Sequence, residues 1–310
     1  MRQFFLLVLA TVFMSTTTNA ETRRIAITFD DAPLGDGPFL TGEKRGAQLL
    51  SGLKNASVEQ AAFFVTTKNI RGKEDKARLN AYAAEGHVIA NHSHSHPWLR
   101  KTKPSKYLRD IDRAEKHLEG YENRRPWFRF PYLDEGPDEE RRDAVRAGLA
   151  KRGLKNGYVT VDNYDWYMNR LAKDAVAAGH CIAMDGLREL YVETILDAAS
   201  FYDGVAVNYL GRQPAHVLLL HENDLAGMFI EDLIAALRRD NWEIITADDA
   251  YQDAIADVNP ETLFNGQGRV AAIADASGAP RRALVSERED ETILARLFVL
   301  HAIIPCGDDQ

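Results

Sequence analysis

Short apolar segments alternate with amphipathic segments from about residue 24 to residue 258. The apolar runs are rich in β-branched and aromatic residues and carry few polar interruptions, which is typical of parallel strands covered on both faces. We predict strands at residues 25–29, 61–66, 87–90, 126–130, 157–161, 216–220 and 242–245, and helices at residues 43–53, 76–85, 105–119, 138–151, 228–238 and 247–256. The alternation favours an α/β fold with a parallel sheet, most simply a barrel-like one of about seven β/α units.

Two stretches depart from this alternation. Residues 167–209 are longer than one crossover connection needs, and they predict two helices broken around residues 179–186. After residue 260 a Gly-rich loop is followed by a predicted helix at residues 286–300, with Ser286 as its cap and Glu289 at the capping-box spacing. We treat residues 259–310 as a C-terminal extension whose role the sequence does not reveal.

The first twenty residues have the pattern of a signal peptide. Arg2 supplies the charged start, residues 4–14 form an apolar core, and residues 18–20 form a small-residue cleavage site. The core is too short to span a bilayer, and no later run of about 18 apolar residues follows it. We therefore expect an exported protein, periplasmic or extracellular, with a main domain at residues 21–258. A retained membrane anchor is the alternative.

Charge and cysteine content exclude several classes of protein. The chain has 38 basic and 46 acidic residues, and loss of Arg2 with the signal peptide would leave 37 against 46, a net charge of −9. An acidic chain of this kind does not favour a nucleic-acid-binding face or a polybasic membrane patch. Cys181 and Cys306 are the two cysteines, and neither belongs to a Cys-x-x-Cys pattern. Export would permit them to pair, and two buried free thiols are the alternative.

Possible metal ligands follow two of the predicted strands. Asp30 and Asp31 end the first strand, and His92 and His96 follow the third. Two imidazoles and a carboxylate, most simply that of Asp31, are a normal ligand set for zinc and leave a coordination position open. His94 should point the other way and not bind. Alternatively, the acidic pair belongs to a turn and helix cap, and the histidines form a solvated loop that scavenges metals.

Other polar residues at strand ends could carry acid–base chemistry. Asp30, if it lies beside water activated by the metal, could act as the general base. Arg129 has apolar flanks and could hold the charge of that base, although a surface cation is the alternative. Backbone N–H groups just after Pro131, starting with Tyr132, could face a developing oxyanion.

The predicted strand at residues 216–220 is followed directly by His221. His221 could be the general acid for a leaving amine, although a histidine after four apolar residues is more often a satisfied core residue. Asp165 would orient it, with Asp248 as a rival. Trp166 would offer a flat apolar wall suited to a sugar ring, and Asp162 could simply cap a turn.

Taken in order, these residues resemble the polysaccharide deacetylases that share the NodB homology domain, carbohydrate esterase family 4. The similar motifs are Thr-Phe-Asp-Asp at 28–31, His-Ser-His-Ser-His at 92–96, Arg-Phe-Pro at 129–131, Asp-Asn-Tyr-Asp-Trp at 162–166 and Leu-Leu-Leu-His at 218–221. The resemblance covers residues 24 to about 258. It implies a distorted barrel of β/α units and a divalent metal, commonly zinc. Asp31, His92 and His96 would be the ligands, Asp30 the base and His221 the acid.

Some features depart from the family's pattern. Ala32 stands in place of a glycine, the glycine of the third motif is delayed to Gly136, and the connection at residues 167–209 is long. These departures affect the shape of the groove and hence the substrate. The resemblance implies an exported metal-dependent hydrolase that removes N-acetyl groups from a glycan. Alternatives are a deacetylase of O-acetyl esters or a small amide, and a non-catalytic saccharide-binding protein on the same fold.

Overall fold

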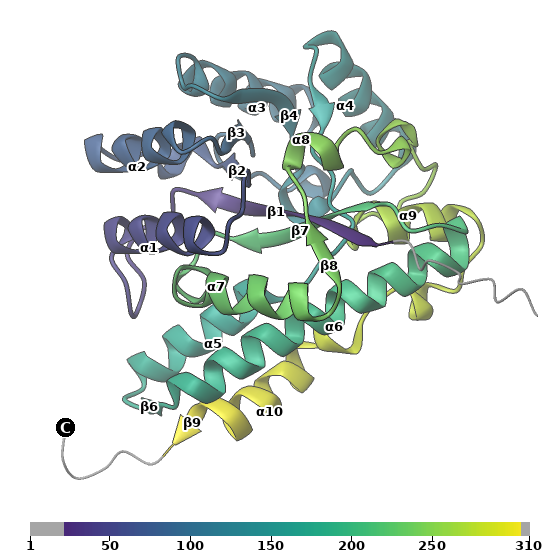
Figure 1. The fold of residues 1–310 in the computed structure, drawn as a ribbon. Coiled ribbons are helices and arrows are strands. Elements are labelled where there is room, and N and C mark those ends of the chain that lie inside the picture. The colour runs from purple at the N-terminus through teal and green to yellow at the C-terminus, as the bar shows by residue number, and fades with distance from the viewer. Residues whose placement is uncertain (1–21, 305–310) are drawn as a thin grey trace, which may run out of the picture.

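The structure, a computed structural model, describes residues 22–304 (Figure 1). The predicted signal peptide and Cys306 lie outside the described residues, so both the signal peptide and the pairing of Cys181 stay predictions. Within residues 22–304, no helix combines the length and the apolar character needed to cross a membrane.

A seven-stranded sheet forms the centre of the molecule. Its strands run in the order β5-β4-β3-β2-β1-β7, β8 also pairs with β1, and every pairing is parallel. The strands are β1 (Arg23–Ala32), β2 (Ala62–Val65), β3 (Val88–Asn91), β4 (Arg124–Phe128), β5 (Lys155–Asn156), β7 (Ala215–His221) and β8 (Trp242–Ile244). Ile25, Ile27 and Phe29 of β1 are fully buried, which explains the uninterrupted apolar run.

Helices cover the outside of the curved sheet, as Figure 1 shows. They are α1 (Gly42–Asn55), α2 (Lys73–Ala84), α3 (Pro104–Leu118), α4 (Glu139–Lys151), α5 (Asp165–Ala177), α6 (Met184–Leu210), α7 (Asp224–Arg239) and α8 (Ala247–Ala250). Short 3₁₀ turns are η1 (Thr67–Asn69), η2 (Leu99–Lys101), η3 (Pro131–Leu133), η4 (Ala254–Asp257), η5 (Arg281–Ala283) and η6 (Glu287–Glu289). This half-barrel of parallel strands and outer helices confirms the predicted α/β barrel-like fold.

The predicted fifth strand is wrong in position. Strand β5 is Lys155–Asn156, whereas within residues 157–161 Val161 makes an isolated bridge with Leu218. The reason lies in the backbone carbonyls of this segment: Gly157 O accepts a 2.7 Å hydrogen bond from Arg129 Nε instead of a sheet partner. Residues 157–161 therefore hold the buried Arg129 side chain through their backbone carbonyl groups.

The long connection was predicted correctly as two helices, α5 and α6, but the position of the break differs. A short strand, β6 (Cys181–Ile182), separates them and pairs antiparallel with β9 (Ile303–Ile304). Gly186 lies inside α6 rather than in the break. A Cβ there would lie 1.9 Å from His301 O, so glycine permits the close approach of the C-terminal helix.

The C-terminal extension contains two helices, α9 (Gly268–Ala276) and α10 (Glu291–Ala302), of which the first was not predicted. Helix α10 begins after Asp290, whose side chain accepts from two backbone N–H groups, whereas Ser286 caps the separate turn η6. Figure 1 shows α10 alongside α5 and α6. Val270, Leu284 and Phe298 belong to the same hydrophobic cluster as β1, so the extension packs onto the main core.

Candidate active site

A pocket of about 490 Å³ opens where the carboxyl ends of the parallel strands meet. Seven residues singled out in the sequence line it: Asp30, Asp31, His92, His96, Tyr132, Trp166 and His221. Arg129 and Asp165 lie behind it, each hydrogen-bonded to a lining residue. The structure thus brings residues from the ends of β1, β3, β4 and β7 and from the start of α5 into one site.

Asp31, His92 and His96 form a group that fits a divalent cation. One potential ligand atom from each residue lies within 4.8 Å of the other two. Asp31 Oδ1 lies 3.6 Å from His96 Nε2 and 3.9 Å from His92 Nε2. His94 lies outside this group: it is buried, and its ring contacts Thr67 Oγ1 and stacks on that of the exposed His117. The separation of His94 from the group agrees with the sequence prediction.

The hydrogen bonds and burial of these three residues suit metal binding. His92 Nδ1 lies 3.0 Å from the carbonyl oxygen of Arg129, which can only accept, so Nδ1 carries a hydrogen and Nε2 is the nitrogen turned toward Asp30 and Asp31. Burial lowers the pKa of His96 to about 4, against the attraction of Asp31, so His96 is neutral at pH 7. Burial opposes ionisation of Asp31, yet the neighbouring histidines and Thr66 bring the pKa of that carboxyl below its usual value.

Several non-glycine residues around the pocket have left-handed backbone conformations. The φ angles are 64° at Asp31, 72° at Ser93, 54° at His96 and 58° at Tyr132. Such conformations cost roughly 1–3 kcal/mol each and persist where surrounding contacts enforce them. Thr66 Oγ1, for example, donates to Asp31 Oδ1 at 2.9 Å. Of these residues, Asp31, His96 and Tyr132 line the pocket, and Ser93 Oγ accepts from the backbone N–H of His96.

Asp30 and Arg129 form a buried ion pair. Arg129 Nη1 lies 2.6 Å from Asp30 Oδ1, and the two side chains are 0% and 4% exposed. The second carboxylate oxygen, Oδ2, lies 3.5 Å from His92 Nε2. The guanidinium also donates to Thr28 Oγ1 and stacks 3.7 Å above the ring of Phe64. Arg129 is therefore not a surface cation, and it fixes Asp30 beside the potential metal site.

His221 is held by Asp165 through two hydrogen bonds. Asp165 Oδ1 lies 2.7 Å from His221 Nδ1, and Oδ2 accepts from the backbone N–H of His221 at 2.8 Å. Burial disfavours the imidazolium, but the charge of Asp165, its hydrogen bond and the more distant Asp31 raise the pKa of His221 to about 9. The rival carboxylate, Asp248, instead pairs with Arg125.

Three aromatic side chains, those of Tyr132, Tyr164 and Trp166, line the pocket. Tyr132 is 56% exposed, with its ring 4.6 Å from that of His96 and 5.4 Å from that of Trp98. The rings of Tyr164 and Trp166 are 5.3 Å apart. Among the described residues, the backbone N–H of Tyr132 has no acceptor, so it is available to a ligand.

Sequence reasoning missed several residues that support the site. Thr66 follows the second strand, a position that could have been recognised as another strand end. Tyr251 Oη donates to Tyr158 O and accepts from Arg129 Nη2 at 2.9 Å. No pattern in the sequence around Tyr251 predicts these two contacts. Gly266 and Gln267 line the pocket from the C-terminal extension. The extension therefore reaches the site.

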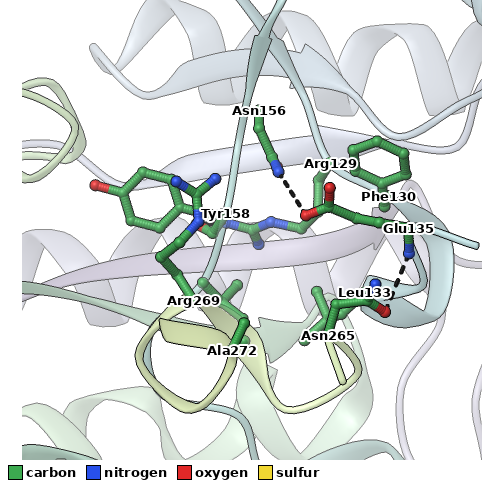
Figure 2. A pocket seen from close by; sticks show the side chains of 11 residues that line it. Arg129, Phe130, Leu133, Glu135, Asn156, Tyr158, Asn265, Arg269 and Ala272 are labelled. Atoms are coloured by element: carbon green, nitrogen blue, oxygen red, sulfur yellow. Dashed lines mark hydrogen bonds between the residues drawn. The ribbon is translucent and has the colours of Figure 1, made fainter. Parts of the chain in front are cut away.

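Behind Arg129 the extension also closes a small cavity of about 20 Å³. Figure 2 shows Asn265 of the extension below the Arg129 side chain and Asn156 above it, while Arg269 of the extension reaches the ring of Tyr158. Asn265 Oδ1 accepts from the backbone N–H of Glu135 at 3.2 Å, while Asn265 Nδ2 is buried without a partner among the described residues. The cavity has room for about one water molecule, which could satisfy that nitrogen.

Residues 17–157 match the sequence model of the polysaccharide deacetylase family. A peptidoglycan-N-acetylglucosamine deacetylase of Bacillus cereus is 28% identical over 167 residues, which are 52% of this chain and 54% of that protein. A chitooligosaccharide deacetylase of Rhizobium leguminosarum bv. trifolii is 36% identical over 99 residues, 32% of this chain and 41% of that protein. The chain thus spans about half the length, or less, of these relatives.

The fold has known counterparts. The crystal structure of a polysaccharide deacetylase from Bacillus cereus matches 72% of this chain and 91% of its own, with a TM-score of 0.53 at 21% identity. A mutant described as a carbohydrate esterase family 4 pseudoenzyme matches 74% of this chain and 67% of its own, with a TM-score of 0.52 at 15% identity. The match over residues 17–157 confirms the resemblance seen in the sequence: this part of the chain is similar to the polysaccharide deacetylase family, and solved structures show the same fold over a longer stretch.

Proposed function

We propose that this protein is an exported, metal-dependent deacetylase that removes N-acetyl groups from a saccharide. The observation that carries the proposal is the convergence of three sets of residues on one pocket. These sets are the Asp30–Arg129 pair, the group formed by Asp31, His92 and His96, and the His221–Asp165 pair. A base, a cation site and an acid within one pocket are the parts that amide hydrolysis requires.

Asp31, His92 and His96 would hold the metal, most simply zinc, because one carboxylate and two imidazoles leave a coordination position open. A divalent cation bound there supplies Lewis acidity, which polarises a carbonyl group and makes water easier to deprotonate. The remaining chemistry belongs to residues of the chain.

Asp30 would take the proton from the attacking water. Its oxygen Oδ1 is occupied by Arg129, and Oδ2 faces His92 Nε2 at 3.5 Å, so Oδ2 is the oxygen placed to accept the proton. The free N–H of Tyr132 would stabilise the negative charge that develops on the carbonyl oxygen. Arg129 pairs with the Asp30 carboxylate at 2.6 Å and so holds the base in place beside the potential metal site.

His221 would give a proton to the amine as the carbon–nitrogen bond breaks. With Nδ1 hydrogen-bonded to Asp165, the other ring nitrogen, Nε2, is the one left to donate. The raised pKa of His221, about 9, keeps the imidazole protonated at neutral pH in the metal-free protein. Trp166 and Tyr132 would hold the sugar between flat apolar surfaces.

The named activities of the relatives suggest the substrate class. They act on N-acetylglucosamine in peptidoglycan and on chitooligosaccharides, so an N-acetylglucosamine-containing glycan is the substrate we propose. Hydrolysis of O-acetyl esters or of a small amide would use the same residues. A non-catalytic saccharide-binding protein is the other candidate, since a relative in fold is described as a pseudoenzyme.

The test is metal analysis of the purified protein followed by an acetate-release screen. Zinc-loaded protein should release acetate from N-acetylglucosamine oligomers, and removal of the metal by a chelator should abolish the release. Release from O-acetylated glycans alone would favour the esterase. Binding of oligomers with no acetate release from any of these compounds would favour the saccharide-binding protein.

A further inference from the structure

Gln267 lies in the C-terminal extension, outside the segment that matches the family, yet it lines the pocket beside Asp162, Tyr164 and Trp166. Its side chain is half-buried. Nothing in the sequence pattern marked this residue, and the proposed hydrolysis does not use it. Its position raises the question of what holds it there.

The backbone on either side of Gln267 is tightly fixed. Before it, the Asn265 side chain accepts from the backbone N–H of Glu135. After it, Arg269 N donates to Val159 O at 2.7 Å. Gly268 has a φ of 82°, and a Cβ there would lie 2.9 Å from Val159 O. Gln267 thus lies in a fixed turn that packs on residues 157–161, the segment whose carbonyl groups hold Arg129.

The side chain of Gln267 is fixed by a buried tyrosine and a buried glutamate. Tyr202 Oη lies 2.9 Å from Gln267 Oε1 and 2.7 Å from Glu289 Oε1. A phenol has one hydrogen and can donate to only one of these oxygens, so the other contact needs a hydrogen from the partner. Glu289 is 5% exposed, and its Oε2 has no partner within residues 22–304.

A protonated Glu289 resolves this conflict. Burial, with the charge of Asp162 nearby, raises the pKa of Glu289 to about 9, so its carboxyl group donates to Tyr202 at neutral pH. Tyr202 then donates to Gln267 Oε1. The amide nitrogen of Gln267, which has no acceptor among the described residues, is left as the donor that faces the pocket.

We infer that Gln267 is a saccharide-binding residue whose side-chain amide donates to a sugar hydroxyl in the pocket, and that Tyr202 and Glu289 orient this amide. The inference rests on the proposed function for the identity of the ligand. It gives the C-terminal extension a role in selecting the substrate. Tyr202 and Glu289 act through Gln267 and are positioning residues.

The experiment measures binding of the N-acetylglucosamine tetramer by calorimetry, in a zinc-loaded protein that carries Asp30→Asn to prevent turnover. Gln267→Ala and Gln267→Glu should each weaken binding about threefold to tenfold, the range expected for one lost hydrogen bond. Gln267→Glu keeps the size of the side chain but loses the N–H donor. It therefore distinguishes the loss of the hydrogen bond from the loss of side-chain volume. In otherwise wild-type protein, the same changes should raise KM for the tetramer with little change in kcat.

Tyr202→Phe tests the orientation of the amide. It should weaken binding as Gln267→Ala does, and the double variant should be no weaker than Gln267→Ala alone, because both changes remove one interaction. The matched control is Tyr191→Phe, since Tyr191 is also buried in α6 and its hydroxyl has no partner among the described residues. Glu289→Gln, which is still a hydrogen donor, should retain most of the binding.

The outcomes are distinguishable from failure of the proposed function. If the wild-type protein releases acetate from the tetramer but the Gln267 and Tyr202 variants bind it as tightly as their parent, the inference is overturned and the proposed function stands. Additive losses in the double variant would overturn the positioning role of Tyr202. A wild-type protein that neither binds nor deacetylates the tetramer would overturn both.

Discussion

Arg129 and Asp30 meet in the interior at 2.6 Å, and the same arginine accepts a hydrogen bond from His92 through its backbone carbonyl. One residue therefore orients both the proposed base and a proposed metal ligand. Because Arg129 is itself held by Gly157 O and by Thr28 Oγ1 of β1, buried contacts fix the position of the base relative to the metal site.

The first prediction concerns the base. Asp30→Asn should lower kcat for acetate release by roughly 10²–10⁴-fold, the usual contribution of a positioned base. The amide oxygen can still accept from Arg129, so the fold and the metal content should be retained. Acetate release and zinc content are the two measurements. Asp112→Asn on the surface of α3, with the same change in charge, is the control. A near-wild-type rate in Asp30→Asn would show that another group is the base.

The second prediction concerns the metal ligands. His92→Ala and Asp31→Asn should reduce the bound zinc well below one ion per chain after dialysis, because each removes one of three ligands. His94→Ala is the matched control, since His94 lies two positions away but outside the group. Elemental analysis by mass spectrometry measures the content. Equal loss in all three variants would mean that zinc binds to the histidine-rich loop in another way.

The third prediction is a pH dependence. The pKa of His221 is raised to about 9 in the folded protein, above its ordinary value of about 6.5. The protonated form is therefore the one favoured by folding. Its stabilising contribution is complete below about pH 6.5 and is lost as the pH rises through 9. As the acid, His221 must be protonated, so kcat should fall on the alkaline side, at or somewhat below pH 9 because a bound cation opposes the imidazolium.

Asp165→Asn tests this assignment, because it removes the negative charge that Asp165 places against the imidazole. The alkaline limb of the kcat profile should move to lower pH by about one unit or more. Profiles of both proteins from pH 5 to pH 10 give the comparison. A limb at the same pH in both proteins would assign that limb to a group other than His221.

The residues at strand ends were predictable from the sequence because their positions follow from the strand pattern alone. Asp30 lies near the end of β1 and pairs with His221, which ends β7, and Arg129 comes directly after β4, so a parallel sheet brings them to one edge whatever the helices do. The choice between Asp165 and Asp248 as the partner of His221 was different. It depends on how far each carboxylate lies from His221 in space, and the spacing of residues along the sequence does not give that distance.

The contribution of the extension could not be predicted for the same reason. Gln267 reaches the pocket because α9 rests on Val159, and this contact joins segments more than 100 residues apart. The predicted strand at residues 157–161 is wrong for a related reason, because Gly157 O accepts from Arg129 Nε rather than from a neighbouring strand. Side-chain hydrogen bonds between distant segments override the local strand preference here.

The fourth prediction concerns how the extension is attached. Gly268 and Gly278 stand near the two ends of α9, with φ of 82° and 89°, so alanine is strained at either position, by about 1–3 kcal/mol. At Gly278 the added Cβ would have no atom within 4 Å, whereas at Gly268 it would lie 2.9 Å from Val159 O. Gly268→Ala should therefore lower the urea midpoint of unfolding more than Gly278→Ala does. Gly268→Ala should also raise KM for a saccharide, because it displaces the neighbouring Gln267. Equal loss of stability in the two variants, with KM unchanged, would show that the turn does not rest on Val159 in solution.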